Sequence, residues 1–168
     1  MSGTLGDAGL ALLHQKGQNI LTETVYTLVA ERLNRPTPRI ALGQALRSLA
    51  NAAIDISDGL GADISHLCTA SGVGAQLQAQ QLPLTPAVQT YIDQTADWAL
   101  PVTTGDDYEL VFTLPRAHQH LVLQAARSVS VPIHCIGHIT AEPELQIQLP
   151  DGSIQPLGAG YDHFNGTL

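Results

Sequence analysis

The sequence predicts an α/β fold in which a mixed β-sheet is flanked by helices. Short apolar runs of strand length alternate with longer segments whose apolar residues recur at helical spacing. The alternation lacks the strict regularity of a parallel strand-helix-strand fold, which favours a mixed sheet. With 168 residues, 44% of them hydrophobic, the chain has the size and apolar content of about one domain.

Three helices are expected in the first 50 residues. Asp7 can cap the first helix, which continues to about residue 16, and Gly17 is suited to end it. Apolar residues at helical spacing predict the second helix. A threonine followed by proline, Thr37 and Pro38, supplies an N-cap and a first-turn residue for the third. The second and third helices are expected over about 20–33 and 38–50.

Strands and helices alternate in the rest of the chain. An apolar strand leads directly into a helix that Gly72 ends. Asp151 and Gly152 predict a two-residue hairpin turn, because both central positions of the favoured turn need positive φ. The expected strands span about 52–56, 73–79, 109–114, 133–139 and 144–149, and the expected helices about 58–70, 86–95 and 115–129.

The charge balance restricts the partners. Seven basic residues against fifteen acidic ones give a formal net charge of −8, which repels nucleic-acid phosphates and anionic lipids. Phosphorylated ligands can still bind if divalent cations lie between them and the carboxylates. Because the N-terminus lacks a basic leader and no apolar run is long enough for a membrane helix, the cytoplasm is the expected location. Cys68 and Cys135 are expected to be reduced structural thiols.

The stretch NAAIDISDGLGADISH, residues 51–66, is the first candidate site. Asp55 interrupts an apolar strand, and because burying an unpaired carboxylate is costly it is expected to need a cation or several donors. Ser57 should share its face of the strand, and Asp58 follows at the helix start, where unpaired N–H groups favour anions. Ser57 or Asp58 could instead be a simple N-cap. Asp63 is interpreted as a solvated charge in the first turn.

The second candidate is the run GDDYEL, residues 105–110, at the entrance to another apolar strand. A glycine before two acidic residues indicates a tight turn that can direct at least one of Asp106 and Asp107 outward, although an ordinary Asx-turn would explain the same pattern. The sequence has no P-loop, HExxH or GxSxG motif, which disfavours a P-loop nucleotide site, a zinc-peptidase site and a serine-hydrolase site.

The motifs RPTPRIALGQAL, AAIDISDGLGADISHLCTASGVGA, GDDYELVFTLP and GYDHF together resemble the C-terminal half of the thiamine-monophosphate kinase family. The resemblance implies a domain of the AIR-synthetase C-terminal kind and the transfer of a phosphoryl group from ATP to thiamine monophosphate, with several Mg²⁺ ions. Such a reaction depends on positioning and charge neutralisation. By this resemblance, Asp55 and Asp58 are Mg²⁺ ligands and Ser57 contacts an ATP phosphate.

The resemblance also implies a substrate site. Asp106 would contact thiamine monophosphate, with Asp107 beside it, and the amphipathic ring of Tyr161 would meet the aromatic part of the substrate. One departure is Thr104, which precedes Gly105 where the family commonly has a second glycine; a β-branched residue disfavours positive φ, so the local turn is expected to differ.

A second departure is the absence of the family's N-terminal domain, with its GDDAAV-type metal motif. The chain is therefore expected to be a C-terminal fragment with little activity alone, in which residues 1–35 are a helical connector and residues 36–168 the AIR-synthetase-related domain. The resemblance implies a homodimeric full-length enzyme. The alternatives are a non-catalytic thiamine-phosphate-binding module and a sister ATP-dependent synthetase of the same fold.

Overall fold

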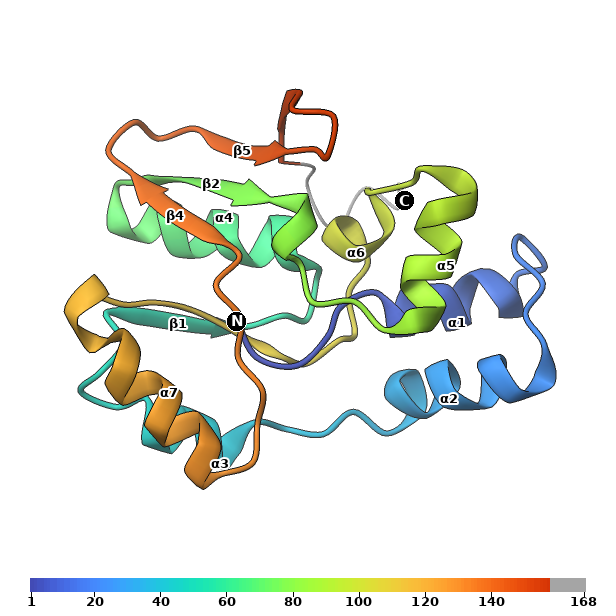
Figure 1. Ribbon diagram of the computed structural model, residues 1–168, viewed down its shortest axis with the longest axis horizontal. Helices are drawn as coiled ribbons and strands as arrows, with labels where there is room; N and C mark the ends of the chain where they lie inside the picture. Colours follow the sequence, from blue (N-terminus) through green and yellow to red (C-terminus); the bar gives the residue numbers. More distant parts are fainter. Residues whose placement is uncertain (158–168) are drawn as a thin grey trace.

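The computed structural model describes residues 1–157, whose strands form two sheets (Figure 1). The smaller sheet is the antiparallel pair β1–β3. In the larger, of order β4-β2-β5-β6, β2 is antiparallel to β4 and parallel to β5, and β5 is antiparallel to β6. The predicted mixed sheet is therefore confirmed. The strands are β1 (Ala52–Asp55), β2 (Gly74–Gln78), β3 (Leu110–Thr113), β4 (Gly137–Thr140), β5 (Leu145–Gln148) and β6 (Ile154–Pro156).

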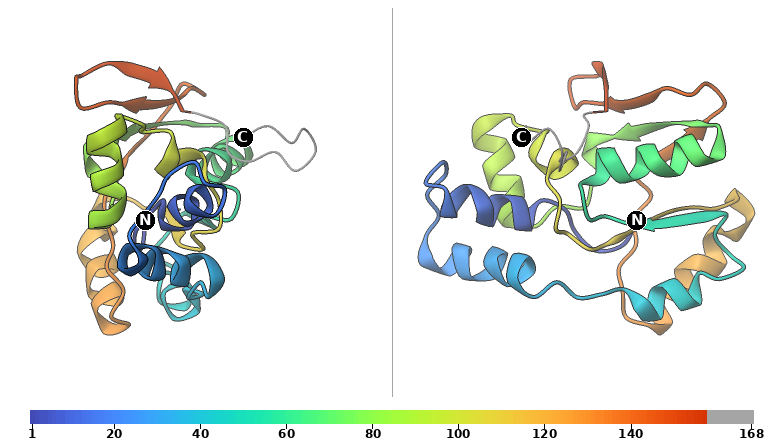
Figure 2. Two further views of the ribbon diagram at one scale, coloured as in Figure 1. Left: turned by 90° about the vertical axis from the view of Figure 1, so that its right-hand side faces the viewer. Right: turned by 180° about the vertical axis from the view of Figure 1, so that it is seen from behind.

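Helices surround these sheets. Helix α4 covers one face of the larger sheet, as the front and back views show (Figures 1 and 2). Helix α1 packs along α2, and α3 packs against α7 beside the smaller sheet. The helices are α1 (Asp7–Gln15), α2 (Glu23–Asn34), α3 (Ile40–Ala45), α4 (Leu60–Ser71), α5 (Pro86–Thr95), α6 (Leu100–Thr103) and α7 (Gln119–Ser128), with 3₁₀ turns at Ala79–Gln81 and Arg116–His118. None of the helices in residues 1–157 is long and apolar enough to cross a membrane.

Two predicted helix starts are wrong. The N-cap of α1 is Gly6, at φ 84°, while Asp7 is the first helical residue and its carboxylate accepts hydrogen bonds from two threonine hydroxyls, those of Thr4 and Thr85. Helix α3 begins after Arg39 without a side-chain cap. The residues Thr37 and Pro38 lie in the preceding segment, which is neither helix nor strand. In both cases tertiary contacts, rather than a local capping bond, set where the helix begins.

The β5–β6 connection also differs from the expected two-residue turn. Gly152 has positive φ (87°), whereas Asp151 is not among the positive-φ residues. The N–H of Gly152 donates to the carbonyl of Leu149, and the N–H of Leu149 donates to Ser153. Because Pro150 fixes a negative φ in the first central position, the turn takes this longer form, with only its glycine left-handed.

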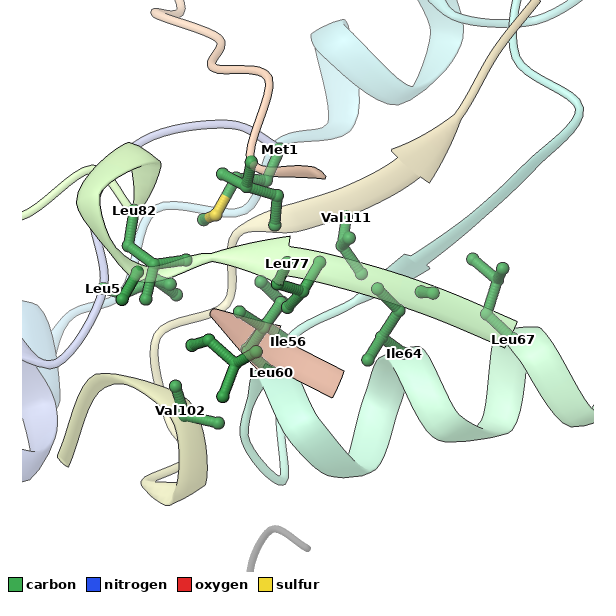
Figure 3. Packing of buried hydrophobic residues seen from close by; sticks show 14 of the residues in the cluster. Met1, Leu5, Ile56, Leu60, Ile64, Leu67, Leu77, Leu82, Val102 and Val111 are labelled. Atoms are coloured by element: carbon green, nitrogen blue, oxygen red, sulfur yellow. The ribbon is translucent and has the colours of Figure 1, made fainter. Parts of the chain in front are cut away.

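The main apolar core lies between α4, β2 and the smaller sheet (Figure 3). Ile56 and Leu60 are fully buried and approach Leu77 of β2. Burial of each such side chain contributes about 1.5–3 kcal/mol. Since Ile56 lies between Asp55 and Ser57, this core fixes the position of the first acidic motif.

Candidate functional site

The two acidic motifs lie side by side because their backbones continue the pairing of β1 with β3. The N–H of Ile56 donates to the carbonyl of Glu109 at 2.8 Å, and the N–H of Tyr108 donates to the carbonyl of Ile56 at 2.8 Å. Beyond them, the N–H of Asp106 donates to the carbonyl of Ser57 at 2.9 Å. Residues far apart in the sequence thereby form one acidic surface.

The turn of the second motif depends on glycine at position 105. A Cβ atom on Gly105 would overlap the carbonyl oxygen of Ser57, so a larger residue would separate the motifs. Thr104 is extended (φ −84°, ψ 137°), a conformation that β-branched residues favour, and its hydroxyl donates to the carbonyl of Leu100 at 2.7 Å. The residues of this loop with positive φ are Asp106 (68°) and Tyr108 (49°). Thr104 therefore requires no left-handed backbone.

Asp55 is exposed, which contradicts the expectation that its carboxylate is buried in an apolar strand. The burial pattern of β1 alternates between exposed and half-buried positions, and Asp55 lies on the exposed face, whereas Ile56 turns into the core. Ser57 and Asp58 are half-buried. Asp55 therefore needs no partner for burial, and the argument that burial demands a cation there is wrong.

Asp63 is buried, with 3% of its surface exposed, and the interpretation of it as a solvated charge is wrong. Its Oδ2 accepts the N–H groups of Ser57 and Asp58, at 2.9 and 3.1 Å. Burial raises the pKa of Asp63, and the two hydrogen bonds act in the opposite direction. Because Asp63 occupies these two donors of the loop before α4, they are not available to an external anion. Its carboxylate instead holds the loop between β1 and α4.

Glu109 is the centre of a buried ion network that the sequence reading missed. Its carboxylate receives two hydrogen bonds from Arg39, at 2.7 and 2.6 Å, one from Arg32 at 2.6 Å and one from the Ser2 hydroxyl at 2.7 Å. Burial acts to raise the pKa of Glu109, but hydrogen bonds from Arg39 and Ser2 and the charge of Arg39 lower it overall. A Cβ atom on Gly3 would overlap this carboxylate. The sequence signal for this network was the position of Glu109, a glutamate directly before an apolar strand.

Asp107 points into the protein, so the structure does not bring it to the surface with Asp106. It is 2% exposed, and the N–H of Gly6 at the start of α1 donates to both of its oxygens, at 3.1 and 3.0 Å. The pKa of Asp107 is raised to about 8, mainly by burial and also by the charge of nearby Asp7, while the Gly6 hydrogen bond acts in the opposite direction. The acidic pair therefore separates into a half-buried residue and a fully buried one.

Tyr108 is a second residue that the sequence reading missed. Tyr108 is 38% exposed. Its pKa is raised by the charge of Asp106, then by desolvation, a hydrogen bond with Asp106 and the charges of Asp55 and Asp58. A hollow of about 400 Å³ is lined by Tyr108, Asp55 and neighbouring residues. A larger groove of about 650 Å³ is lined by none of the acidic residues of the two motifs.

The oxygen donors at this surface suit part of a Mg²⁺ coordination shell. Mg²⁺ prefers oxygen ligands and commonly takes one or two carboxylates together with water and substrate phosphates. Asp55 and Asp58 provide two such carboxylates. Within residues 1–157, no group of three or more His, Cys, Asp or Glu side chains is arranged to hold a metal ion alone. A metal ion held by these two carboxylates would therefore need phosphate or other ligands to complete its shell. Tyr161 lies outside the described residues.

Residues 1–150 match the family described as "AIR synthase related protein, C-terminal domain". The chain belongs to this family. It is 42% identical to the thiamine-monophosphate kinase of Salmonella typhimurium over 98% of the chain and 51% of that relative. This domain thus spans about half the length of the curated relatives it matches.

Solved structures agree with this assignment of the AIR synthase related domain. The thiamine-monophosphate kinase of Stenotrophomonas maltophilia K279a has a TM-score of 0.79 and 37% identity, over 90% of this chain and 48% of that one. The structure of AaThiL complexed with AMPPCP and TMP has a TM-score of 0.78 and 29% identity, over 97% of this chain and 50% of that one. The expected fold of the AIR-synthetase C-terminal kind is confirmed.

Proposed function

We propose that this chain forms the C-terminal part of an enzyme that transfers a phosphoryl group from ATP to thiamine monophosphate. The observation that carries the proposal is the backbone pairing of the two acidic motifs, from Ile56–Glu109 to Ser57–Asp106, which makes one surface of them. Similarity to thiamine-monophosphate kinases over 98% of the chain supports this reaction. Half of each relative lies outside the match, so we expect the chain alone to show little turnover.

In this proposal the chain's own residues bind and orient the reactants. Asp55 and Asp58 would hold Mg²⁺, which supplies charge neutralisation for the phosphates when bound. The Ser57 hydroxyl would contact an ATP phosphate, and Asp106 and Tyr161 would contact thiamine monophosphate. Asp107 is buried and accepts the N–H of Gly6, so in this proposal it supports the loop and does not bind the substrate.

The wider organisation belongs to the same proposal. Residues 1–35 would connect the domain, residues 36–168, to an N-terminal ATP-binding domain, and the complete enzyme would be a cytoplasmic homodimer. The length of the relatives supports the connector, because they extend well beyond the part that this chain matches.

The direct test joins this chain to the part of the Salmonella typhimurium enzyme that it does not match and measures phosphorylation of thiamine monophosphate with ATP and Mg²⁺. Turnover should appear in the joined protein. It should fall by more than about 100-fold in Asp55→Asn and Asp58→Asn, since even outer-shell partners of metals are worth about 10–100-fold. The control is Asp93→Asn, because Asp93 is exposed on α5 and its carboxylate accepts only a local hydrogen bond from Gln89.

Calorimetric measurement of thiamine monophosphate binding to the chain itself distinguishes the kinase proposal from a non-catalytic binding module. Binding of thiamine monophosphate that needs no Mg²⁺ and survives Asp55→Ala would favour a binding module and contradict the metal assignment. A folded joined protein without turnover would contradict the kinase proposal.

A further inference from the structure

We propose that Asp63 is a positioning residue of the acidic site: by accepting the N–H groups of Ser57 and Asp58, its buried carboxylate sets the directions of the two side chains that would meet the phosphate and Mg²⁺. The inference rests on the proposed function, which gives Ser57 and Asp58 those roles. It assigns Asp63 a role in ligand binding at a position where only a solvated charge was expected.

The two hydrogen bonds fix consecutive peptide groups of the loop between β1 and α4. The Oδ2 atom of Asp63 accepts the N–H of Ser57 at 2.9 Å and that of Asp58 at 3.1 Å. Each N–H belongs to a rigid, planar peptide unit. Fixing two such units in succession fixes the backbone between them, and with it the directions in which the side chains of Ser57 and Asp58 leave the chain. The carboxylate therefore acts on both side chains through the backbone.

These bonds differ from an ordinary helix cap. In a cap, a residue before the helix accepts an N–H of the first turn. The N-cap of α4 is Gly59, which makes no side-chain capping bond, and the helix begins at Leu60. Asp63 lies inside the first turn, and its side chain reaches back to N–H groups that precede the N-cap. The contact therefore orders the loop that carries the first acidic motif.

Other contacts hold the same loop from the side of the second motif. The carbonyl of Ser57 accepts the N–H of Asp106 at 2.9 Å. Gly59 approaches the carbonyl group of Thr103 so closely that a Cβ atom would lie 2.9 Å from it. Asp63 is itself held by α4, where its N–H donates to the carbonyl of Gly59 at 3.0 Å. The loop is thus fixed between α4 and the second motif, and the carboxylate of Asp63 joins it to the helix.

The geometry and the charge of this carboxylate can be separated by substitution. An ionised carboxylate only accepts hydrogen bonds, and one of its oxygens can receive two N–H donors. Asparagine offers an oxygen at the same distance from the backbone without the charge. Glutamate keeps the charge but places its oxygens one methylene further from the helix. A positioning role for Asp63 therefore predicts that asparagine replaces it better than glutamate.

The test uses the joined enzyme with the variants Asp63→Asn and Asp63→Glu. Calorimetry of AMPPCP binding with and without Mg²⁺ reports on the site independently of turnover. Asp63→Glu should weaken the Mg²⁺-dependent binding by about tenfold or more, whereas Asp63→Asn should stay within about threefold of the wild type. The KM for thiamine monophosphate should be nearly unchanged in both, because Asp106 and Tyr161, which would bind it, belong to other segments.

The matched control is Asp151→Glu. Asp151 also accepts a main-chain N–H, that of Ser153 at 2.9 Å, but in the exposed turn between β5 and β6, so this variant should bind AMPPCP as the wild type does. Urea unfolding checks that each variant folds. If Asp63→Glu does not fold, Asp63→Ala replaces it with the same expected loss, together with faster hydrogen exchange at the amides of Ser57 and Asp58.

The outcomes separate this inference from the proposed function. Mg²⁺-dependent AMPPCP binding that is equal in the wild type and Asp63→Glu would overturn the inference, as would a loss in Asp63→Asn as large as that in Asp63→Glu. In either case, inactivation by Asp55→Asn would leave the proposed function standing. A folded wild-type joined protein without turnover would overturn both.

Discussion

The buried carboxyl group of Asp107 makes the stability of the chain depend on pH in a direction opposite to that of an ordinary paired aspartate. Burial raises its pKa from 3.8 to about 8 in the folded chain. Between these two values the folded chain keeps a proton that the unfolded chain releases. The free energy of unfolding therefore falls as pH rises through this window, and the dependence on Asp107 ends above about pH 8.

The magnitude follows from the size of the window. One proton difference changes the free energy of unfolding by about 1.4 kcal/mol per pH unit. Between pH 5 and pH 7 the contribution of Asp107 should thus decrease by about 3 kcal/mol. Asp107→Asn removes the titration and keeps an oxygen that can accept the N–H of Gly6. Relative to the wild type, this variant should become steadily more stable with rising pH.

Urea unfolding followed by circular dichroism at pH 5, 6, 7 and 8 measures this difference. Other titrating groups are common to both proteins, so their contributions largely cancel when wild type and Asp107→Asn are compared at each pH. Asp93→Asn, at an exposed position, serves as the control and should run parallel to the wild type. If Asp107→Asn also runs parallel to the wild type from pH 5 to 8, Asp107 is ionised in the folded chain and the reasoning from burial is refuted.

Two further substitutions test the contacts that hold the acidic loops. Asp63→Ala leaves the N–H groups of Ser57 and Asp58 without their acceptor and should lower the free energy of unfolding by about 1–3 kcal/mol in urea titrations; an unchanged value would show that water replaces the carboxylate. Glu109→Gln leaves two guanidinium groups without a counter-charge and should cost about 3–5 kcal/mol, seen as a lower thermal midpoint. A midpoint within a degree of the wild type would mean that the network contributes little net stability.

Because hydrophobic periodicity is a local property, the sequence was sufficient to locate β1, β2, β3, β5 and most helices. The strand expected over 133–139 overlaps β4 only at its end, and β6 was not expected. The strand expected over 52–56 is β1, and the helix expected over 86–95 has the bounds of α5. The four-residue helix α6 was missed, since one turn carries too little periodicity to be recognised.

The candidate site was less accessible to sequence reasoning, because its geometry depends on which segments pair. Nothing local to DISD indicates that it lies against GDDY, and that pairing brings Asp106 beside Ser57. The error over Asp63 has the same origin: its charge is acceptable in the interior only because two N–H groups of the preceding loop meet it. An acidic residue in a first helical turn looks identical in the sequence whether it faces solvent or such a loop.

Glu109 physically connects the acidic site to the N-terminal segment of the chain. Its carbonyl accepts the N–H of Ile56 in the first motif, while its carboxylate binds Arg32 of α2, Arg39 before α3, and Ser2. A shift of α2 would therefore move Arg32, a charged partner of Glu109. Because an unpaired buried carboxylate is costly, the chain resists such a shift unless Glu109 moves with it. The geometry of the two motifs is thus set by the N-terminal segment as well as by the strands that carry them.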